Sequence, residues 1–394
     1  MKKQTQAIHL EYERRDAYDS LSVPVYNTLA YEFDNAAVMA EAFTDKIKAP
    51  DYSRVENPTV TNLERRVAAL TDAVHTTAFN SGMAAISNTL MALAAQGKNI
   101  VTSKHLFGNT YALLVATLRR FGVKVRLRDL TNIEAVREAI DDDTCCVFLE
   151  ILTNPQLEVA DLKAISEVAH EKNVPLVVDS TVIPFTQFSA KSLGVDIEVV
   201  SSSKYVSGGA TSLGGLVIDY GTPYNGDFAK RLYGEMLFNF GAYMTPQVAY
   251  MQTIGLETLD ARYRVQSSNA LELAKKLRSL PQIKNVNYVG LEDNPYHELA
   301  QRQFGKTAGA MICIDLESKE ACFSFLNNLK LIHRATNLFD NRSLAIHPAS
   351  TIFGAFSESM RKSMDVKDTT IRLSIGLEDV DDFFEDIKQA VDSL

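Results

Sequence analysis

One lysine of the chain stands where a nucleophile could act. Lys204 follows an apolar run and three serines in the segment 201–209, SSSKYVSGG. A lysine against an apolar wall can lose its proton and attack a carbonyl group, which is the requirement for a Schiff base. Serine hydroxyls and loop N–H groups beside it can hold an anion. A surface lysine in a serine-rich loop has the same local sequence, so both interpretations of Lys204 stand on this segment alone.

An aspartate upstream of Lys204 indicates which cofactor a reactive lysine could bind. Asp179 lies near the end of the apolar run 175–180, PLVVDS, where a carboxylate is costly to bury without a cationic partner. The protonated ring nitrogen of pyridoxal 5′-phosphate is such a partner, and keeping it protonated makes that cofactor an electron sink. Asp179 could instead cap a helix or begin a turn. Together, Lys204 and Asp179 favour pyridoxal phosphate more strongly than either residue does alone.

Two further segments offer contacts for such a cofactor. In NSGMAA, residues 80–85, Ser81 and Gly82 precede a predicted helix, whose first N–H groups and dipole attract a phosphate. Many helices begin in this way, so the signal is a general one. Phe107, in the segment HLFGNTY, could stack on a flat ring or simply pack in the core.

These residues fall at the ends of elements of an α/β fold. Short apolar runs alternate with amphipathic stretches, which is typical of a mostly parallel sheet covered on both faces. In such a sheet the ligand lies beyond the carboxyl ends of the strands, where Asp179 and Lys204 are found. The predicted strands are 99–103, 123–127, 145–151, 175–180 and 197–202, and the predicted helices are 62–70, 82–96, 111–121, 133–139 and 161–171.

The sequence pattern predicts three parts of the chain. Residues 1–60 mix polar segments and turn signals without a sustained period, which indicates an N-terminal arm that reaches a neighbouring subunit and not a separate domain. Residues 61–250 carry the α/β pattern and form the predicted cofactor-binding domain. Residues 251–394 include a helical stretch at 256–280, short apolar runs and a final amphipathic helix at 380–394, which indicates a smaller α+β domain.

Composition favours small-molecule chemistry in the cytoplasm. The chain has 394 residues, 46% of them hydrophobic, and a net charge of −9, which argues against a nucleic-acid or anionic-membrane surface. No apolar run approaches the roughly 20 residues that span a bilayer, and the first residues hold no signal-peptide stretch, so no membrane contact is expected. The four cysteines form no CxxC pair and have no histidine at ligand spacing, so we expect reduced thiols and no metal site.

Eight ordered motifs connect the chain to a known family. The sequence resembles the pyridoxal-phosphate enzymes of cysteine and methionine metabolism, the trans-sulfuration group related to cystathionine γ-synthase. The resemblance covers nearly the whole length and implies a pyridoxal-phosphate transferase type I fold. The motifs are YSRVENPT (52–59), NSGMAA (80–85), LFGNTY (106–111), EILTNP (150–155), VVDST (177–181), SSSKY (201–205), HPAST (347–351) and RLSIGLED (372–379).

The resemblance implies a role for each matching residue. Lys204 corresponds to the Schiff-base lysine, Asp179 to the partner of the ring nitrogen, and Arg372 to the clamp for the substrate α-carboxylate. Asn337 falls at a second position that contacts the substrate carboxylate. The other implied cofactor contacts are Phe107, Asn154 and Thr181 around the ring, Ser81, Gly82, Met83, Ser201 and Ser203 at the phosphate, and Tyr52 and Arg54 at the phosphate of a neighbouring subunit.

The chain also departs from the commoner pattern of this family. Phe107 stands where a tyrosine usually stacks on the ring, so stacking is kept and the phenol is lost. Tyr111 is a candidate for the acid–base work of that phenol, although a core tyrosine on a helix face fits the sequence equally well. Asn109 replaces a cysteine that γ-lyases often show. Near the C-terminus, Asn337 and Asp340 match the O-acetylhomoserine sulfhydrylase branch, while its glycine is Phe339 here.

The resemblance implies a reaction class and a main alternative. We expect γ-replacement on O-acetylhomoserine with sulfide or methanethiol, giving homocysteine or methionine. The alternative is a carbon–sulfur γ-lyase that releases 2-oxobutyrate, ammonia and a thiol. A non-catalytic protein that kept the fold is a hypothesis of another class, and no GxGxxG motif supports a dehydrogenase. The implied assembly is a homo-oligomer, at least a dimer, with the tetramer common among relatives.

Overall fold

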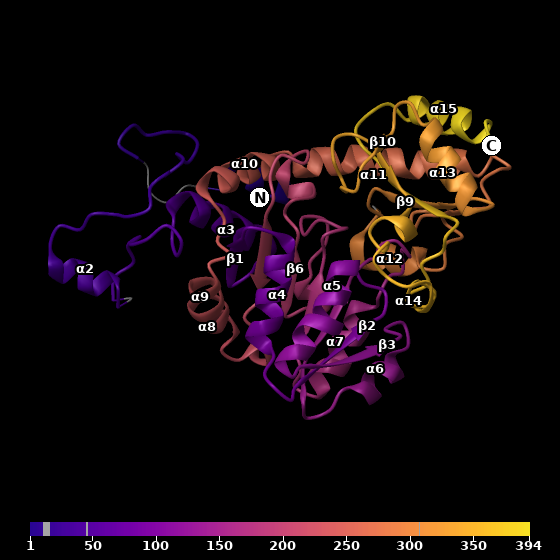
Figure 1. Ribbon diagram of the computed structural model, residues 1–394. Coiled ribbons are helices and arrows are strands. Elements are labelled where there is room, and N and C mark those ends of the chain that lie inside the picture. Colours follow the sequence, from indigo (N-terminus) through magenta and orange to yellow (C-terminus); the bar gives the residue numbers. More distant parts are fainter. Residues whose placement is uncertain (11–15, 45, 307) are drawn as a thin grey trace.

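Two sheets organise the chain in a computed structural model that describes residues 1–10, 16–44, 46–306 and 308–394. The larger sheet has the strand order β1-β7-β6-β5-β4-β2-β3, and the smaller sheet has the order β10-β11-β12-β9-β8. Figure 1 shows the two sheets in separate parts of the molecule, with α10 and α11 in succession along the upper side. The strands are β1 (His75–Phe79), β2 (Asn99–Ser103), β3 (Lys124–Arg128), β4 (Thr144–Glu150), β5 (Leu176–Asp179), β6 (Ile197–Val200), β7 (Gly215–Asp219), β8 (Asn285–Asn287), β9 (Met311–Asp315), β10 (His333–Arg334), β11 (Leu344–Ile346) and β12 (Thr370–Ser374).

Helices cover the sheets and connect their strands. The central strands of the larger sheet are buried on both faces: Val147 and Leu149 of β4 belong to one apolar cluster, while Cys146 and Phe148 belong to another on the opposite face. The α-helices are α1 (Lys3–His9), α2 (Ala36–Ala42), α3 (Pro58–Thr71), α4 (Gly82–Leu93), α5 (Gly108–Ala112), α6 (Ile133–Ala139), α7 (Leu162–Glu171), α8 (Phe228–Arg231), α9 (Phe238–Phe240), α10 (Pro246–Glu257), α11 (Leu259–Leu277), α12 (His297–Phe304), α13 (Lys319–Asn328), α14 (Glu358–Ser363) and α15 (Val380–Val391).

The predicted α/β architecture is confirmed, with two additional strands. All five predicted apolar runs form strands, and β3, β2, β4, β5 and β6 run parallel. The strands β1 and β7 pair antiparallel with each other, and β7 also pairs antiparallel with β6. The pattern of apolar runs does not predict β1, because Thr76 and Thr77 at its centre are polar. Both are β-branched and buried, which suits a strand.

Two predicted helices differ from the structure. The stretch 111–121 is helical but irregular, because a π-helix at Leu113–Thr117 and a 3₁₀ turn at Leu118–Phe121 follow α5. The stretch 256–280 is interrupted at Thr258, where α10 ends and α11 begins. The first of these helices starts earlier than predicted, at Pro246, which suits a first helical turn because proline has no N–H to leave unbonded.

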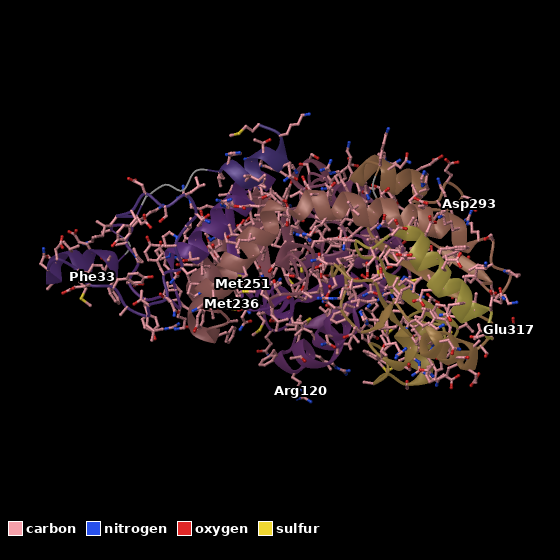
Figure 2. All side chains as sticks on the ribbon, turned by 90° about the horizontal axis from the view of Figure 1, so that it is seen from above. Phe33, Arg120, Met236, Met251, Asp293 and Glu317 are labelled. Atoms are coloured by element: carbon pink, nitrogen blue, oxygen red, sulfur yellow. The ribbon has the colours of Figure 1, made fainter. Side chains whose placement is uncertain are left out.

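The N-terminal 60 residues divide into a packed helix and a projecting segment. Helix α1 packs on α3 and α10, and its Lys3 Nζ donates to the carbonyl oxygens of Phe185 and Phe188. The segment that carries α2 extends away from both sheets (Figure 1), and Phe33 lies near its far tip (Figure 2). Leu21, Leu29 and other apolar side chains are exposed on this segment. Within the described ranges, no helix is both long enough and apolar enough to cross a membrane.

Candidate active site

Asp179 and Lys204 belong to the carboxyl ends of two neighbouring strands, β5 and β6, since Asp179 ends β5 and Lys204 lies in the loop after β6. Asp179 is the last residue of β5, and its Oδ1 accepts a hydrogen bond from the backbone N–H of Thr181 at 2.9 Å. The hydroxyl oxygen of Thr181 in turn accepts from the N–H of Ser201, at 2.8 Å. A turn and not a helix follows Asp179, so this aspartate is not a helix cap.

The carboxyl group of Asp179 is half-buried and has no cationic partner among the residues that the structure describes. Burial raises its pKa, while its hydrogen bonds from Thr181 lower it. No ion pair joins it to a lysine, arginine or histidine among the residues the structure describes. A site of this kind fits a cation that binds from outside the chain.

Lys204 is a half-buried amine with a lowered pKa. Its Nζ donates to Oδ1 of Asn337 at 2.7 Å, so the loop before β11 meets the loop after β6 at this point. Burial, followed by repulsion from the Arg372 guanidinium, lowers the pKa of Lys204 to about 8. A substantial share of Lys204 is therefore neutral near pH 7.5, as nucleophilic attack and proton removal both require.

Arg372 connects the smaller sheet to the same site. It lies on β12 with 2% of its surface exposed, and its Nη1 donates to Oδ1 of Asn154 at 3.2 Å. Its Nη2 donates to the carbonyl oxygens of Thr336 and Asn337, at 3.2 and 3.3 Å. Burial lowers the pKa of Arg372 to about 10, so the guanidinium remains charged. All of these acceptors are neutral, and within the described ranges no carboxylate pairs with Arg372. A buried cation of this kind is suited to a bound carboxylate.

The start of α4 forms a narrow seat beside the Lys204 loop. The Ser81 hydroxyl caps this helix by accepting from the N–H of Ala84 at 3.1 Å, while the first N–H groups, those of Gly82 and Met83, point out of the helix end. A Cβ added to Gly82 would lie 2.6 Å from the Ser201 side chain. Only glycine lets the helix begin this close to Ser201, so the N–H groups of the helix start and the Ser201 hydroxyl lie near one another.

Three predicted site residues are engaged elsewhere. The Ser203 hydroxyl exchanges hydrogen bonds with the backbone of Gly214, at 2.9 and 3.1 Å, and its contact with a phosphate stays a prediction. Tyr52 and Arg54 contact each other, with the guanidinium 5.5 Å from the ring centre, and Arg54 donates to the Phe238 carbonyl. Among the residues that the structure describes, neither Tyr52 nor Arg54 forms a hydrogen bond with Lys204.

The aromatic residues near the site differ in what they can do. The ring of Tyr111 packs edge-on against Phe356 with 5.9 Å between centres, which favours the core interpretation of Tyr111 over acid–base work. Phe107 is half-buried at the start of α5, and its backbone N–H donates to Glu150 Oε1 at 2.5 Å. Glu150 lies at a strand end where the sequence predicts ligand contacts, but the sequence assigned it no role. Its place at the carboxyl end of a parallel strand, next to Asp179 in register, is the signal that could have identified it.

Phe339 takes a backbone conformation that favours glycine. Its φ is +56°, and its buried ring stacks on Tyr205 with 4.0 Å between centres and 8° between planes. The left-handed backbone costs roughly 1–2 kcal/mol. Burial of a phenylalanine ring contributes about 2–3 kcal/mol, and the stack about 1 kcal/mol more. The stabilisation from packing of the Phe339 ring therefore exceeds the cost of its left-handed backbone. This residue lies two positions after Asn337.

Substitutions at Phe339 separate these two contributions. We expect Phe339→Ala to lower the free energy of unfolding by about 3–5 kcal/mol, because it leaves a cavity and keeps the strained backbone. Phe339→Gly is expected to lower it by roughly 1 kcal/mol less, because glycine adopts positive φ readily. Urea denaturation of both variants measures the difference. A glycine variant less stable than the alanine variant would show that backbone strain at this position is negligible.

Comparisons with known proteins identify the family. Residues 4–392 match the family described as Cys/Met metabolism PLP-dependent enzyme, where PLP is pyridoxal phosphate. The chain belongs to this family. Its members depend on the cofactor that the sequence predicted, and the predicted type I fold is confirmed.

Relatives within the family have two different activities. An L-methionine gamma-lyase of Fusobacterium nucleatum subsp. polymorphum is 37% identical over 394 residues, covering 99% of this chain and 98% of the relative. An O-acetyl-L-homoserine sulfhydrylase of Corynebacterium glutamicum is 31% identical, covering 98% and 95%. A crystal structure from Campylobacter jejuni, described as an O-acetylhomoserine (thiol)-lyase, has a TM-score of 0.95 with 34% identity and full coverage of both chains. That structure contains a lysine joined to the cofactor as N′-pyridoxyl-lysine-5′-monophosphate.

The residues of this chain fit the cofactor of the family. The α4 seat beside Ser201 has N–H groups and a hydroxyl for a phosphate, and Ser201 comes this close to the helix start only because residue 82 has no side chain. Asp179 is a half-buried carboxyl group without a cationic partner among the described residues, and it could pair with a ring nitrogen. Lys204 supplies an amine with a lowered pKa.

The lowered pKa of Lys204 has a kinetic consequence. With a pKa of about 8, about a quarter of Lys204 is neutral near pH 7.5, compared with about one in a thousand for a lysine of pKa 10.5. We expect covalent uptake of pyridoxal phosphate by cofactor-free protein to accelerate about tenfold per pH unit below pH 8 and to level off above it. Stopped-flow absorbance measures this rate. A rate that still climbs at pH 10 would contradict the shift.

Proposed function

We propose that this protein catalyses γ-replacement on O-acetylhomoserine, with sulfide or methanethiol as the sulfur donor. The observation that carries the proposal is the amide of Asn337 at 2.7 Å from the Lys204 amine. Its segment, with Asn337 and Asp340, matches the sulfhydrylase branch of the family in sequence. Similarity to sulfhydrylases, including that of Corynebacterium glutamicum, supports the same reaction.

We assign the binding of the amino-acid substrate to Arg372 and Asn337. Arg372 is a buried cation with neutral acceptors only, and a substrate α-carboxylate supplies the missing negative charge. Because Arg372 also donates to Asn154, the same guanidinium aligns the substrate with the loop after β4. The side-chain N–H₂ of Asn337 can donate to the carboxylate while its Oδ1 orients the Lys204 amine.

We assign proton transfer to Lys204 and the electrostatic support of the cofactor ring to Asp179. Pyridoxal phosphate, when bound, supplies an electron sink that makes protons next to the substrate amino group acidic. Asp179 keeps a negative charge against the ring nitrogen. Lys204, neutral because of its lowered pKa, accepts a substrate proton at Nζ, and Asn337 holds that nitrogen in place.

The overall reaction exchanges one group on the substrate γ-carbon. The bond between Cγ and the acetyl oxygen breaks, and acetate leaves with the electron pair. A bond from sulfur to Cγ forms, and the sulfur proton is released. Sulfide as donor gives homocysteine, and methanethiol gives methionine.

A carbon–sulfur γ-lyase is the second candidate, and a specific observation favours it. The identity to the Fusobacterium nucleatum L-methionine gamma-lyase, 37%, exceeds the 31% to the Corynebacterium glutamicum sulfhydrylase. The lyase reaction uses the same Lys204, Asp179 and Arg372, and differs in whether water or a thiol reacts last. Asn109, where γ-lyases often carry a cysteine, argues for the sulfhydrylase.

A product assay tests the choice between the two reactions. Purified holoenzyme is incubated with O-acetylhomoserine, with and without sulfide or methanethiol, and separately with methionine alone. The proposal predicts homocysteine or methionine only when the sulfur donor is present. Release of 2-oxobutyrate from methionine without added thiol, at a comparable rate, would assign the protein to the lyases.

We also propose that the active sites are shared between subunits. Tyr52 and Arg54 adjoin a projecting segment with exposed apolar side chains, and they do not contact Lys204 in their own chain. A second copy of the chain is the proposed neighbour whose cofactor phosphate they reach. The assembly is therefore at least a dimer, with the tetramer as the expected form.

Mixed subunits provide the test of this sharing. Arg54→Ala and Lys204→Ala chains, each inactive alone, should regain part of the activity when they are unfolded and refolded together. One kind of site in the mixed dimer then combines an intact Lys204 with an intact Arg54. Mixing either variant with itself is the control. Absence of any recovery, in mixtures shown to contain hetero-oligomers, would count against shared sites.

A further inference from the structure

Glu150 is a buried carboxyl group that none of the proposed steps uses. It is the last residue of β4, has 6% of its surface exposed, and lies opposite Asp179 in the β4–β5 register. Its Oε1 accepts from the N–H of Phe107 at 2.5 Å, and the backbone N–H of Asn154 also donates to its carboxyl group. One buried side chain therefore connects two loops that come from different strands.

Each of the two loops carries a residue that is predicted to contact the cofactor ring. Phe107 directly precedes α5 and is the residue predicted to stack on the ring, while Asn154 follows β4 and accepts from Arg372. We propose that Glu150 is a positioning residue that fixes the Phe107 loop and the Asn154 loop on β4, and thereby sets the ring-stacking face and the Arg372 guanidinium together. This inference rests on the proposed site, and it does not depend on which sulfur reaction follows.

The surroundings of Glu150 favour its neutral form. Burial raises its pKa well above the usual range, the neighbouring Asp179 raises it further, and the two backbone hydrogen bonds only partly oppose this. A protonated carboxyl group still accepts both N–H groups through its oxygens. With Glu150 neutral, Asp179 is left as the carboxylate that faces the ring nitrogen. A glutamine should then replace Glu150 with little loss, because an amide oxygen accepts the same hydrogen bonds without charge.

Three variants and one matched control test this role. Glu150→Gln keeps the length and the acceptor, Glu150→Leu removes both acceptors, and Glu150→Asp keeps the acid but shortens its reach. The control is Glu64→Leu, because Glu64 on α3 is a half-buried acid that also accepts a backbone N–H, that of Ala78 at 2.7 Å, and desolvation raises its pKa to about 8. The readouts are the Kd of cofactor-free protein for pyridoxal phosphate, the KM and kcat for the preferred amino-acid substrate, and the melting temperature.

We expect Glu150→Gln to stay within about twofold of the natural protein in Kd and KM. Glu150→Leu and Glu150→Asp should raise the Kd for the cofactor and the substrate KM by about tenfold or more, because displaced site groups lose their alignment. Glu64→Leu should lower the melting temperature and leave Kd and KM within about twofold. If the leucine variant does not fold, the Kd and KM of the aspartate variant test the positioning role of Glu150.

Two results would overturn the inference. An unchanged Kd and KM in the folded leucine or aspartate variant would show that Glu150 positions nothing in the site. A glutamine variant as impaired as the leucine variant would show that charge on Glu150, and not its role as an acceptor, is what matters. Because cofactor Kd is read without turnover, failure of the sulfhydrylase proposal in the product assay leaves this test intact.

Discussion

Replacement of Lys204 by alanine is expected to lower turnover by at least about a thousandfold and to abolish the covalent attachment of pyridoxal phosphate. The physical reason is that one amine with a pKa lowered to about 8 serves both as nucleophile and as proton acceptor. Asn337 should then lose the hydrogen-bond donor that it has at 2.7 Å. Turnover with the preferred substrate and the visible absorbance of the dialysed protein measure both effects.

A second lysine controls for loss of stability in this experiment. Lys191 is exposed and donates to the Asp72 carbonyl, so Lys191→Ala should leave turnover and absorbance within about twofold of the natural protein, as surface substitutions usually do. A Lys204→Ala protein that keeps the absorbance of a lysine-bound cofactor after dialysis would refute the assignment of Lys204.

Replacement of Arg372 by alanine is expected to lower kcat/KM for the amino-acid substrate by about thirtyfold to several thousandfold. This range corresponds to the roughly 2–5 kcal/mol that truncating one partner of a buried charge pair costs. Arg372→Lys should recover only part of the loss, because a single ammonium cannot reproduce the forked contact with a carboxylate. Steady-state kinetics with O-acetylhomoserine or methionine, whichever is the better substrate, measures the loss.

The structural contacts of Arg372 require a separate control. Arg372 also holds Asn154, Thr336 and Asn337, so its removal could disturb the fold as well as the substrate site. Arg334→Ala is the matched variant, since Arg334 lies on β10 of the same sheet and donates to the Leu326 carbonyl. A similar fall in kcat/KM for both variants, or a normal KM in Arg372→Ala, would contradict carboxylate binding by Arg372.

Much of the fold could be predicted because the central strands of the larger sheet are buried on both faces, although the edge strand β3 is partly exposed. Such strands appear in the sequence as unbroken apolar runs, and each of the five runs forms a strand of the larger sheet. The strand β1 was overlooked because Thr76 and Thr77 are buried polar residues whose pairing with β7 lies far away in sequence. The local pattern of residues does not indicate a strand partner that is distant in the sequence.

The site residues could be predicted where a family motif lies at the carboxyl end of a strand. Residues at other places in the fold were harder to predict. Asp179, Thr181, Ser201 and Lys204 follow neighbouring strands, so the topology of the sheet alone brings them together. Arg372 reaches the site from the other sheet, and only the family resemblance indicated it. Two contacts depend on the direction in which a side chain points, which neither spacing nor resemblance specifies. They are the hydrogen bond of Ser203 to Gly214 and that of the Phe107 N–H to Glu150.

The central claim is that the cofactor is held at the loops after β5 and β6, with Lys204 as its attachment point. Borohydride reduction of the holoenzyme, digestion, and mass spectrometry of the peptides test this claim most directly. The account predicts the mass of a reduced pyridoxyl phosphate on the peptide that contains Lys204, at close to one group per chain. The same mass on another lysine, with the Lys204 peptide unmodified, would contradict it.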